Sequence, residues 1–172
     1  HLIDSSPVDT SPTSPIRDRA VNMSDRPAPP LSREDPSISL RTGRVVFVGA
    51  GPGTADLITV RGARALATAD VVLFDALTDD SLRDTAPAAR WINVGKRGYD
   101  HGTAQDHINA LMVAHACRGL TVVRLKGGDP SVFGRLEEEL EVLQAEGIAC
   151  EVVPGVTAAL AAAAQTLRPL TR

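Results

Sequence analysis

The chain has 172 residues and a formal net charge of −3, with 43% hydrophobic and 3% aromatic residues. This length and composition suit one globular domain with a buried core, whereas the negative charge and scarce aromatic residues argue against binding to nucleic acid. No run reaches the roughly 20 apolar residues of a membrane helix, no secretory signal opens the chain, and Cys117 and Cys150 lack CxxC spacing, so we expect a cytoplasmic protein without disulfides.

The first part of the chain differs in composition from the rest. Residues 1–40 hold seven of the twelve prolines, none of the fourteen glycines and no aromatic residue. Such a segment cannot bury enough apolar surface to fold, so we predict a disordered proline-rich segment at 1–41 and a folded domain at 42–172. Met23 opens MSDRPAPP and reads like a natural start, but the sequence does not decide between this start and one upstream.

From Arg44 onward, short β-branched runs alternate with helical patterns, which is typical of parallel βαβ units. The expected strands are Arg44–Gly49, Val71–Phe74, Trp91–Val94, Thr121–Leu125 and Cys150–Val153. The expected helices are Thr59–Thr68, Asp79–Asp84, Ala104–Arg118 and Leu136–Glu146. The sequence therefore predicts an α/β fold in which helices flank a parallel five-stranded sheet.

The last expected helix has one apolar and one acidic side. Leu136, Leu140 and Leu143 are spaced to form a buried face, and Gly147 stands where a helix ends. The acidic residues are most simply its solvated surface; they are Glu137, Glu138, Glu139, Glu141 and Glu146.

The first expected strand runs into VGAGPGT, residues 48–54, which invites comparison with a dinucleotide-binding turn. Such a turn needs G-x-G-x-x-G, a helix that follows it, and an acidic residue about 20 positions further on. Asp75 meets the last condition, but Thr54 replaces the third glycine and Pro52 removes a backbone donor. On this motif alone, a tight strand-to-helix turn without a phosphate is at least as well supported.

Three more glycine-bearing loops follow expected strands; they are Gly95–Tyr99, Lys126–Arg135 and Pro154–Thr157. The carboxyl ends of parallel strands meet at one edge of a sheet, and open α/β sheets bind ligands there. The paired Gly127 and Gly128 allow the backbone to approach a ligand closely. We therefore predict that the four loops form one active-site rim.

With these loops in place, the sequence resembles the uroporphyrinogen-III C-methyltransferases, tetrapyrrole methylases that use S-adenosylmethionine. The segments that carry the resemblance are GRVVFVGAGPGTADLITVRG, ADVVLFDAL, VGKRG, VVRLKGGDPSVFGR and VVPGVTAAL, in the order of the family. Together they are specific, because other tetrapyrrole methylases share the GPG turn but typically lack GKR and LKGGDPxxFGR in this form. The resemblance covers about residues 43–172 and stops before the second domain of the family fold.

The resemblance implies the first domain of a two-domain methylase, homodimeric when complete, which converts uroporphyrinogen III to precorrin-2. It places the methyl donor in a cleft between the domains, so GAGPG is not expected to hold a pyrophosphate. The positions that match the cofactor side of this cleft are Pro52, Gly127, Gly128, Asp129 and Thr157. Polar positions tied to catalysis or substrate handling match Asp75, Lys96 and Arg135.

The implied reaction moves a methyl group from a sulfonium to a pyrrole carbon, so in-line positioning supplies much of the acceleration. A base must then remove a proton, and Asp75, on a strand-end loop, is the candidate. For an isolated aspartate in such a loop, capping of a turn or of the following helix is an equally good interpretation.

The distribution of charge favours an acidic substrate. Outside the glutamate-rich helix, residues 41–172 carry fourteen Lys and Arg against ten Asp and Glu. Lys96, Arg97, Lys126 and Arg135 fall on the expected rim loops, where ammonium and guanidinium groups bind carboxylates. About half of these cations are expected to solvate loop tips instead.

Asp100, His101, Asp106 and His107 lie close together in the sequence, but their spacing fits no structural zinc site, so no metal is expected. The chain departs from the family pattern at three places. Ala76 stands where an arginine is usual, Leu136–Glu138 where a glycine pair is usual, and Ala158–Ala164 replaces a more polar stretch.

Alternative functions stay open at this point. They are another tetrapyrrole (precorrin) methylase, a binding or assembly half without catalysis and, more distantly, an NAD-dependent oxidoreductase. The sequence does not decide between the sirohaem and cobalamin branches, or whether the whole polypeptide is fused to a dehydrogenase or chelatase.

Overall fold

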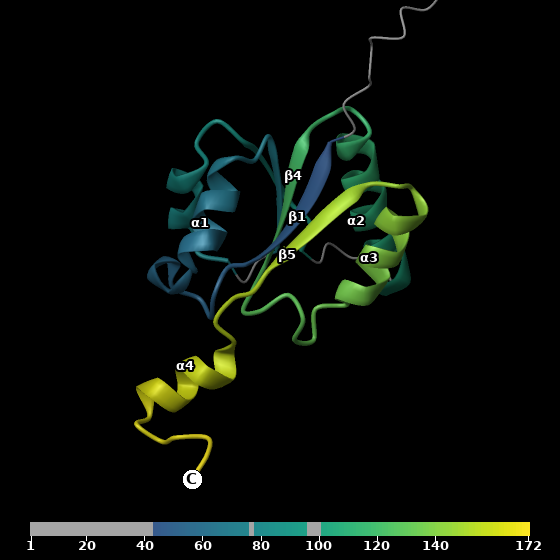
Figure 1. Ribbon diagram of the computed structural model, residues 1–172. Helices are drawn as coiled ribbons and strands as arrows, with labels where there is room; N and C mark the ends of the chain where they lie inside the picture. Colours follow the sequence, from purple (N-terminus) through teal and green to yellow (C-terminus); the bar gives the residue numbers. More distant parts are fainter. Residues whose placement is uncertain (1–42, 76–77, 96–100) are drawn as a thin grey trace, which may run out of the picture. The chain divides into compact units, whose positions relative to one another are not determined.

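The computed structural model describes residues 43–75, 78–95 and 101–172, so the segment predicted to be disordered at 1–41 lies outside the described residues. Five parallel strands form one sheet in the order β3-β2-β4-β1-β5 (Figure 1). The strands are β1 (Arg44–Gly49), β2 (Val71–Phe74), β3 (Arg90–Asn93), β4 (Thr121–Lys126) and β5 (Ala149–Val153). The predicted α/β fold is thereby confirmed, with every strand boundary within about one residue of the expected one.

Helices connect the strands, and all four expected helices are present. They are α1 (Val60–Ala67), the 3-10 helix η2 (Asp80–Thr85), α2 (His101–Ala116) and α3 (Leu136–Ala145). Two further helices were not expected, namely the 3-10 helix η1 (Ala55–Leu57) and α4 (Ala158–Gln165). Among the described residues, no helix is long and apolar enough to cross a membrane.

Residues along each strand alternate between two cores, one on each face of the sheet. Val46 and Val48 of β1 pack on the face that α1 and η2 cover, in a cluster that includes Leu66 of α1. Val45 and Phe47 pack on the opposite face, which α2 and α3 cover (Figure 1). This period of two is what a parallel strand buried on both faces requires.

The strand order creates a switch point between β1 and β4. The chain leaves β1 by α1, on one face, to reach β2, and it leaves β4 by α3, on the other face, to reach β5. Right-handed crossovers in opposite directions along a sheet must lie on opposite faces. The switch point therefore lies at the carboxyl ends of β1 and β4, and open α/β sheets bind ligands at such a place.

The prediction for the glutamates of α3 was wrong at one position. Glu139 is 0% exposed, whereas Glu137, Glu138, Glu141 and Glu146 are exposed as expected. Glu139 lies four residues before the buried Leu143, so both side chains belong to the side of α3 that faces the sheet. A buried carboxylate needs charged or hydrogen-bonding partners, and β4 supplies them.

Candidate functional site

A cavity of about 580 Å³ lies at the carboxyl edge of the sheet, lined by the loops that follow β1, β4 and β5. The residues that line it are Gly51, Pro52, Gly53, Gly127, Gly128, Asp129, Val132, Phe133, Thr157, Ala158 and Ala159. The five residues matched to the cofactor side of the family cleft are all among them. Sequence positions separated by more than 100 residues are thus brought to one cavity by the parallel sheet.

Backbone hydrogen bonds join the loops after β1 and β4 at the floor of the cavity. Gly51 N–H donates to the Gly128 carbonyl (3.3 Å), and Gly128 N–H donates to the Gly51 carbonyl (2.7 Å). Ala50 N–H donates to the Lys126 carbonyl (2.8 Å). These donors are committed to protein acceptors, and Pro52 has no N–H, so the loop does not present the row of free donors that a pyrophosphate requires.

The start of α1 also argues against a dinucleotide turn. In such a turn the helix begins at the glycines, so that its N-terminus points at the phosphates. Here α1 begins at Val60, after η1, and Thr59 caps it by accepting a hydrogen bond from Gly62 N–H (3.0 Å). The positive end of the α1 dipole is therefore separated from the glycine loop.

Glycines allow the three loops to meet. A Cβ on Gly49 would lie 2.6 Å from the Gly128 carbonyl oxygen and 2.6 Å from the Gly155 Cα, well inside van der Waals contact. A Cβ on Gly155 would approach the same Gly128 oxygen more closely still. Close backbone packing thus explains the glycines at 49 and 155. A Cβ on Gly128 would have room, but Gly128 has a φ of 66°, in the left-handed region that favours glycine.

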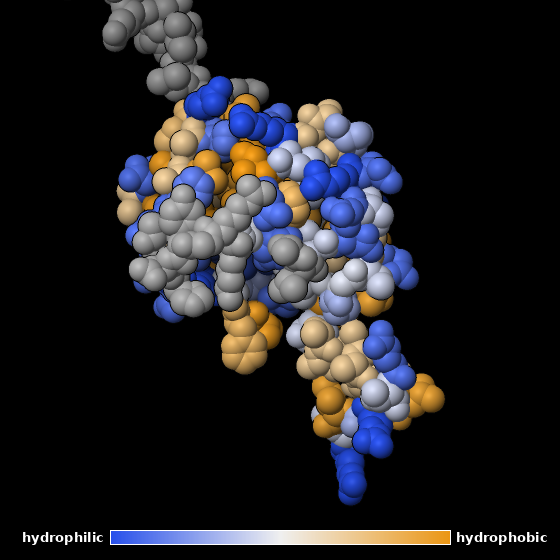
Figure 2. All heavy atoms as spheres, turned by 180° about the vertical axis from the view of Figure 1, so that it is seen from behind, coloured by the Kyte–Doolittle hydropathy of each residue, from blue (hydrophilic) through white to orange (hydrophobic). Residues whose placement is uncertain are grey.

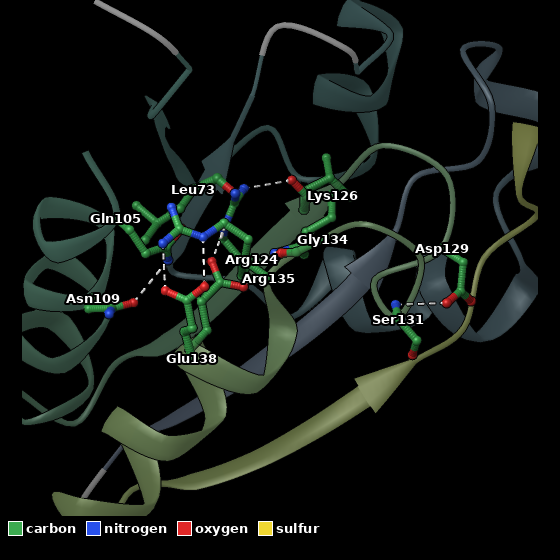
Figure 3. Close-up of polar contacts among 12 residues, drawn as sticks. Leu73, Gln105, Asn109, Arg124, Lys126, Asp129, Ser131, Gly134, Arg135 and Glu138 are labelled. Atoms are coloured by element: carbon green, nitrogen blue, oxygen red, sulfur yellow. Dashed lines mark hydrogen bonds and ion pairs between the residues drawn. The ribbon is translucent and has the colours of Figure 1, made fainter. Parts of the chain in front are cut away.

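Asp129 ties the β4 loop to the β5 loop. Its Oδ1 accepts a hydrogen bond from Ser131 N–H (2.8 Å, Figure 3), and its Oδ2 accepts one from Gly155 N–H (2.9 Å). One carboxylate thus fixes the turn of its own loop and the position of the next loop. Backbone donors to a carboxylate form strong, charge-assisted bonds, so this side chain sets the shape of one cavity wall.

Arg135 lies at the end of the same β4 loop, beside a second cavity of about 630 Å³ that runs along α3. Its guanidinium donates two hydrogen bonds to the carboxylate of Glu138, at 2.7 and 2.6 Å (Figure 3). The bond from Glu138 raises the pKa of Arg135, and the bond from Arg135 lowers the pKa of Glu138. The Arg135 side chain is 45% exposed, so a carboxylate from solution can reach the guanidinium.

Lys126 occupies a different place from the one expected for a rim cation. Its side chain is only 6% exposed, and the ammonium donates to the Gly134 carbonyl and to the Glu139 carboxylate. Burial lowers the pKa of Lys126, and the negative charge of Glu139 opposes this shift. The ammonium therefore lies beneath the β4 loop and not at its tip.

One residue of this buried group, Arg124, was missed by sequence reasoning. Arg124 Nε donates to Glu139 Oε1 (3.1 Å), and Arg124 also donates to the carbonyls of Leu73 (3.4 Å) and Leu125 (3.1 Å). A signal for it exists in the sequence, because Arg124 and Lys126 interrupt an apolar strand at a spacing of two. That spacing puts both cations on one face of the sheet, where they need a shared counter-ion.

Asp75 directly follows β2 and is partly buried. Its carbonyl accepts a hydrogen bond from Thr78 Oγ1 (3.0 Å), and its negative charge acts to raise the pKa of Lys126. The cap of η2 is Asp79, which accepts from Ser81 N–H (2.9 Å), so the capping of the following helix that was considered for Asp75 belongs to Asp79. The Ser81 bond lowers the pKa of Asp79.

Two residues expected at the site lie outside the described residues; they are Lys96 and Arg97. The same holds for Ala76, for Asp100 and for the side chain of His101. In the rest of the chain, which the structure does describe, no group of three or more His, Cys, Asp or Glu side chains is arranged to hold a metal ion.

Comparison with known proteins matches residues 44–172 to the family of Tetrapyrrole (Corrin/Porphyrin) Methylases. Over 130 residues, or 76% of the chain, the sequence is 51% identical to a uroporphyrinogen-III C-methyltransferase of Pseudomonas aeruginosa, covering 53% of that protein. It is 52% identical to a siroheme synthase of Actinobacillus pleuropneumoniae over 75% of the chain and 27% of that protein. The chain thus spans between about a quarter and about half of these relatives.

The fold of the chain is also similar to that of a solved structure. This structure is a uroporphyrin-III C-methyltransferase from Thermus thermophilus in complex with S-adenosylhomocysteine, with a TM-score of 0.64 and 45% sequence identity. The similarity covers 76% of the present chain and 54% of that one.

Proposed function

The chain belongs to the tetrapyrrole (corrin/porphyrin) methylases, and from this premise we propose that residues 42–172 form the first domain of an S-adenosylmethionine-dependent uroporphyrinogen-III C-methyltransferase. The observation that carries the proposal is the cavity at the β1–β4 switch point, because it gathers Pro52, Gly127, Gly128, Asp129 and Thr157. The names of the relatives and the ligand in the Thermus thermophilus structure support the same assignment.

The residues of this cavity fit the proposed cofactor. A volume of about 580 Å³ is in the usual range for a small-molecule site, and the partly buried Gly127 and Gly128 have no side chain to prevent close approach of a ligand. We assign Pro52, Gly127, Gly128, Asp129 and Thr157 to binding of S-adenosylmethionine, which supplies an electrophilic methyl group when bound. The protein then contributes orientation, which is the main source of acceleration for such a transfer.

We assign polar residues outside the lining of this cavity to the substrate. Arg135, with Lys96 and Arg97, is assigned to the carboxylates of the tetrapyrrole, and Asp75 to removal of the proton that leaves the macrocycle. Lys126 is buried in an ion pair with Glu139. We therefore assign Lys126 to holding the β4 loop from below and not to binding the substrate.

We further propose that a second domain closes the cleft and that the complete protein is a homodimer. Large apolar side chains are exposed beside the cavity and beyond it; they are Val132, Phe133, Leu160, Leu167 and Leu170. Figure 2 shows hydrophobic surface at the end of the molecule where Figure 1 places α4. Exposed apolar surface of this kind marks a region that packs against another domain or subunit.

The siroheme synthases among the relatives favour the sirohaem branch of tetrapyrrole synthesis for the whole protein. Cys117 and Cys150 are both free and exposed, which fits the reducing cytoplasm. A different tetrapyrrole methylase is the second candidate, because a cobalt precorrin-4 methyltransferase structure also resembles the chain, with a TM-score of 0.66 and 36% identity.

The cofactor assignment predicts which ligands bind. A form of the protein extended through the second domain should bind S-adenosylhomocysteine in isothermal titration calorimetry and should give no heat with NAD. The reason is that the N–H groups of Ala50 and Gly51 are used within the protein and that Pro52 has none. NAD binding that Gly51→Ala abolishes, without any response to S-adenosylhomocysteine, would refute the assignment.

The substrate assignment predicts the effect of Arg135→Ala in the extended protein. A charge-assisted contact contributes about 1.5–3 kcal/mol, so methylation at limiting uroporphyrinogen III should fall about tenfold or more, with little change in affinity for S-adenosylhomocysteine. Arg83→Ala is a matched control, because Arg83 is also 45% exposed and pairs with Asp80 at a spacing of three. Equal methylation rates in the two variants would remove Arg135 from the substrate site.

A further inference from the structure

A buried ionic group lies directly beneath the loop that carries three of the proposed cofactor residues. Its centre is the carboxylate of Glu139 on α3, which is 0% exposed. One carboxylate oxygen accepts from Arg124 and the other accepts from Lys126, so a single anion serves two buried cations of β4. Arg124 and Lys126 are each 5% exposed as whole residues.

Lys126 connects this group to the loop. The chain leaves β4 at Lys126 and returns toward α3 at Gly134, and the Lys126 ammonium donates to the Gly134 carbonyl. The bond therefore closes the base of the loop at residues 127–134. A Cβ on Gly134 would clash with the backbone carbonyl of Pro130 and would also lie 2.9 Å from the Lys126 Cε, so the turn that brings the Gly134 carbonyl to Lys126 requires glycine.

The loop needs such an anchor because its backbone is strained. Phe133 and Arg135 have φ values of 52° and 51°, in the left-handed region that non-glycine residues rarely adopt. The Phe133 side chain is fully exposed, so it contributes no packing to hold that conformation. Residues kept in such conformations persist only where surrounding contacts enforce them.

We propose that Glu139 is a positioning residue for the cofactor site, and that it holds the loop at residues 127–134 in its binding conformation through Lys126. Glu139 neutralises the buried ammonium and directs it at the Gly134 carbonyl. The affinity for the methyl donor is then set in part by a side chain that lies outside the cavity. This assignment rests on the proposed function for its ligand, but the anchoring of the loop does not.

The first test measures the loop in the 172-residue chain. Chymotrypsin cleaves after exposed phenylalanine, so the rate of cleavage between Phe133 and Gly134, followed by mass spectrometry under folding conditions, reports how firmly the loop is held. Glu139→Gln should raise this rate about tenfold or more, because local opening controls access to the bond. Glu141→Gln, a change of the same kind on the exposed side of α3, should leave the rate unchanged.

A second variant separates positioning from folding. Glu139→Gln leaves two buried cations, Lys126 and Arg124, without their counter-ion and can prevent folding. The double variant Glu139→Gln with Lys126→Met removes one of these charges, and Arg124 keeps its carbonyl acceptors. The double variant should recover part of the lost thermal stability but keep the fast cleavage at Phe133. A folded double variant cleaved at the wild-type rate would overturn the proposal.

Calorimetry on the protein extended through the second domain tests the link to the cofactor. The double variant should bind S-adenosylhomocysteine about tenfold more weakly than the wild type, and Glu141→Gln should bind it equally well. Wild-type affinity in the double variant would overturn the positioning role of Glu139. Failure of the wild type itself to bind would refute the proposed cofactor instead, and the cleavage rates would still decide whether Glu139 anchors the loop.

Discussion

Replacing Asp129 with Ala is expected to weaken binding of S-adenosylhomocysteine to the extended protein by tenfold or more, and to destabilise the fold by about 1–3 kcal/mol. The carboxylate accepts from Ser131 N–H and Gly155 N–H, so its removal leaves two backbone donors without their acceptor and releases the β5 loop from the β4 loop. The cavity wall between Gly128 and Thr157 then loses its fixed shape. Calorimetry and thermal unfolding measure the two effects separately.

Asp129→Asn provides a graded comparison, because the single oxygen of its amide can keep one of the two hydrogen bonds. The affinity of this variant for S-adenosylhomocysteine should lie between those of the wild type and Asp129→Ala. Asp70→Ala is the matched control. Asp70 also joins two segments by accepting a backbone hydrogen bond, from Thr121 N–H (2.8 Å), but it does so at the amino end of β4. Asp70→Ala should cost stability without changing ligand affinity, and equal losses of affinity in both variants would contradict the role of Asp129.

The length of the chain is expected to have a large effect on the rate of methyl transfer. Residues 1–172 should transfer methyl groups to uroporphyrinogen III at least about a hundredfold more slowly than a chain that continues through the second domain. The described cavity has walls from three loops of one domain, and the apolar residues beside it are exposed. In-line transfer requires both reactants to be held, and a misplacement of about 1 Å costs on the order of a hundredfold.

The measurement uses labelled S-adenosylmethionine and compares the two chain lengths at equal concentration. Size-exclusion chromatography should also show that the shorter chain self-associates, because its apolar surface has no partner domain. Comparable rates of methyl transfer would mean that residues 1–172 hold a complete site, and the proposal of a cleft between two domains would have to be abandoned.

Much of the fold follows from local patterns in the sequence. The β-branched runs Arg44–Gly49 and Val71–Phe74 form strands at the residues expected, because strands buried on both faces need continuous apolar sequence. The helix α4 was not expected. Its sequence, AALAAAAQ, has no alternation of apolar and polar residues from which a period can be read, and its residues are exposed or only partly buried.

The cavity was predictable because it follows from topology. Loops after parallel strands share one edge, so Pro52, Gly128 and Thr157 were expected together from their positions after β1, β4 and β5. The contacts beneath the loops were not predictable in the same way. Whether Glu139 faces solvent or the sheet depends on the rotation of α3, and the glutamates on both sides of it hide that rotation in the sequence.

The location of Lys126 could not be predicted from the sequence either. As the last residue of a strand it was assigned to the rim, but its long side chain turns beneath the loop because Glu139 and the Gly134 carbonyl offer partners there. Its location depends on a contact thirteen residues away in the sequence, which the pattern of a single strand does not contain.

The central claim is that the cavity lined by the loops after β1, β4 and β5 holds the methyl donor of a tetrapyrrole methylase. The most direct test is a crystal structure of the extended protein with S-adenosylhomocysteine. We predict ligand density in the cavity lined by Gly51–Gly53, Gly127–Asp129 and Thr157. Density at another place, with this cavity empty at saturating ligand, would contradict the account.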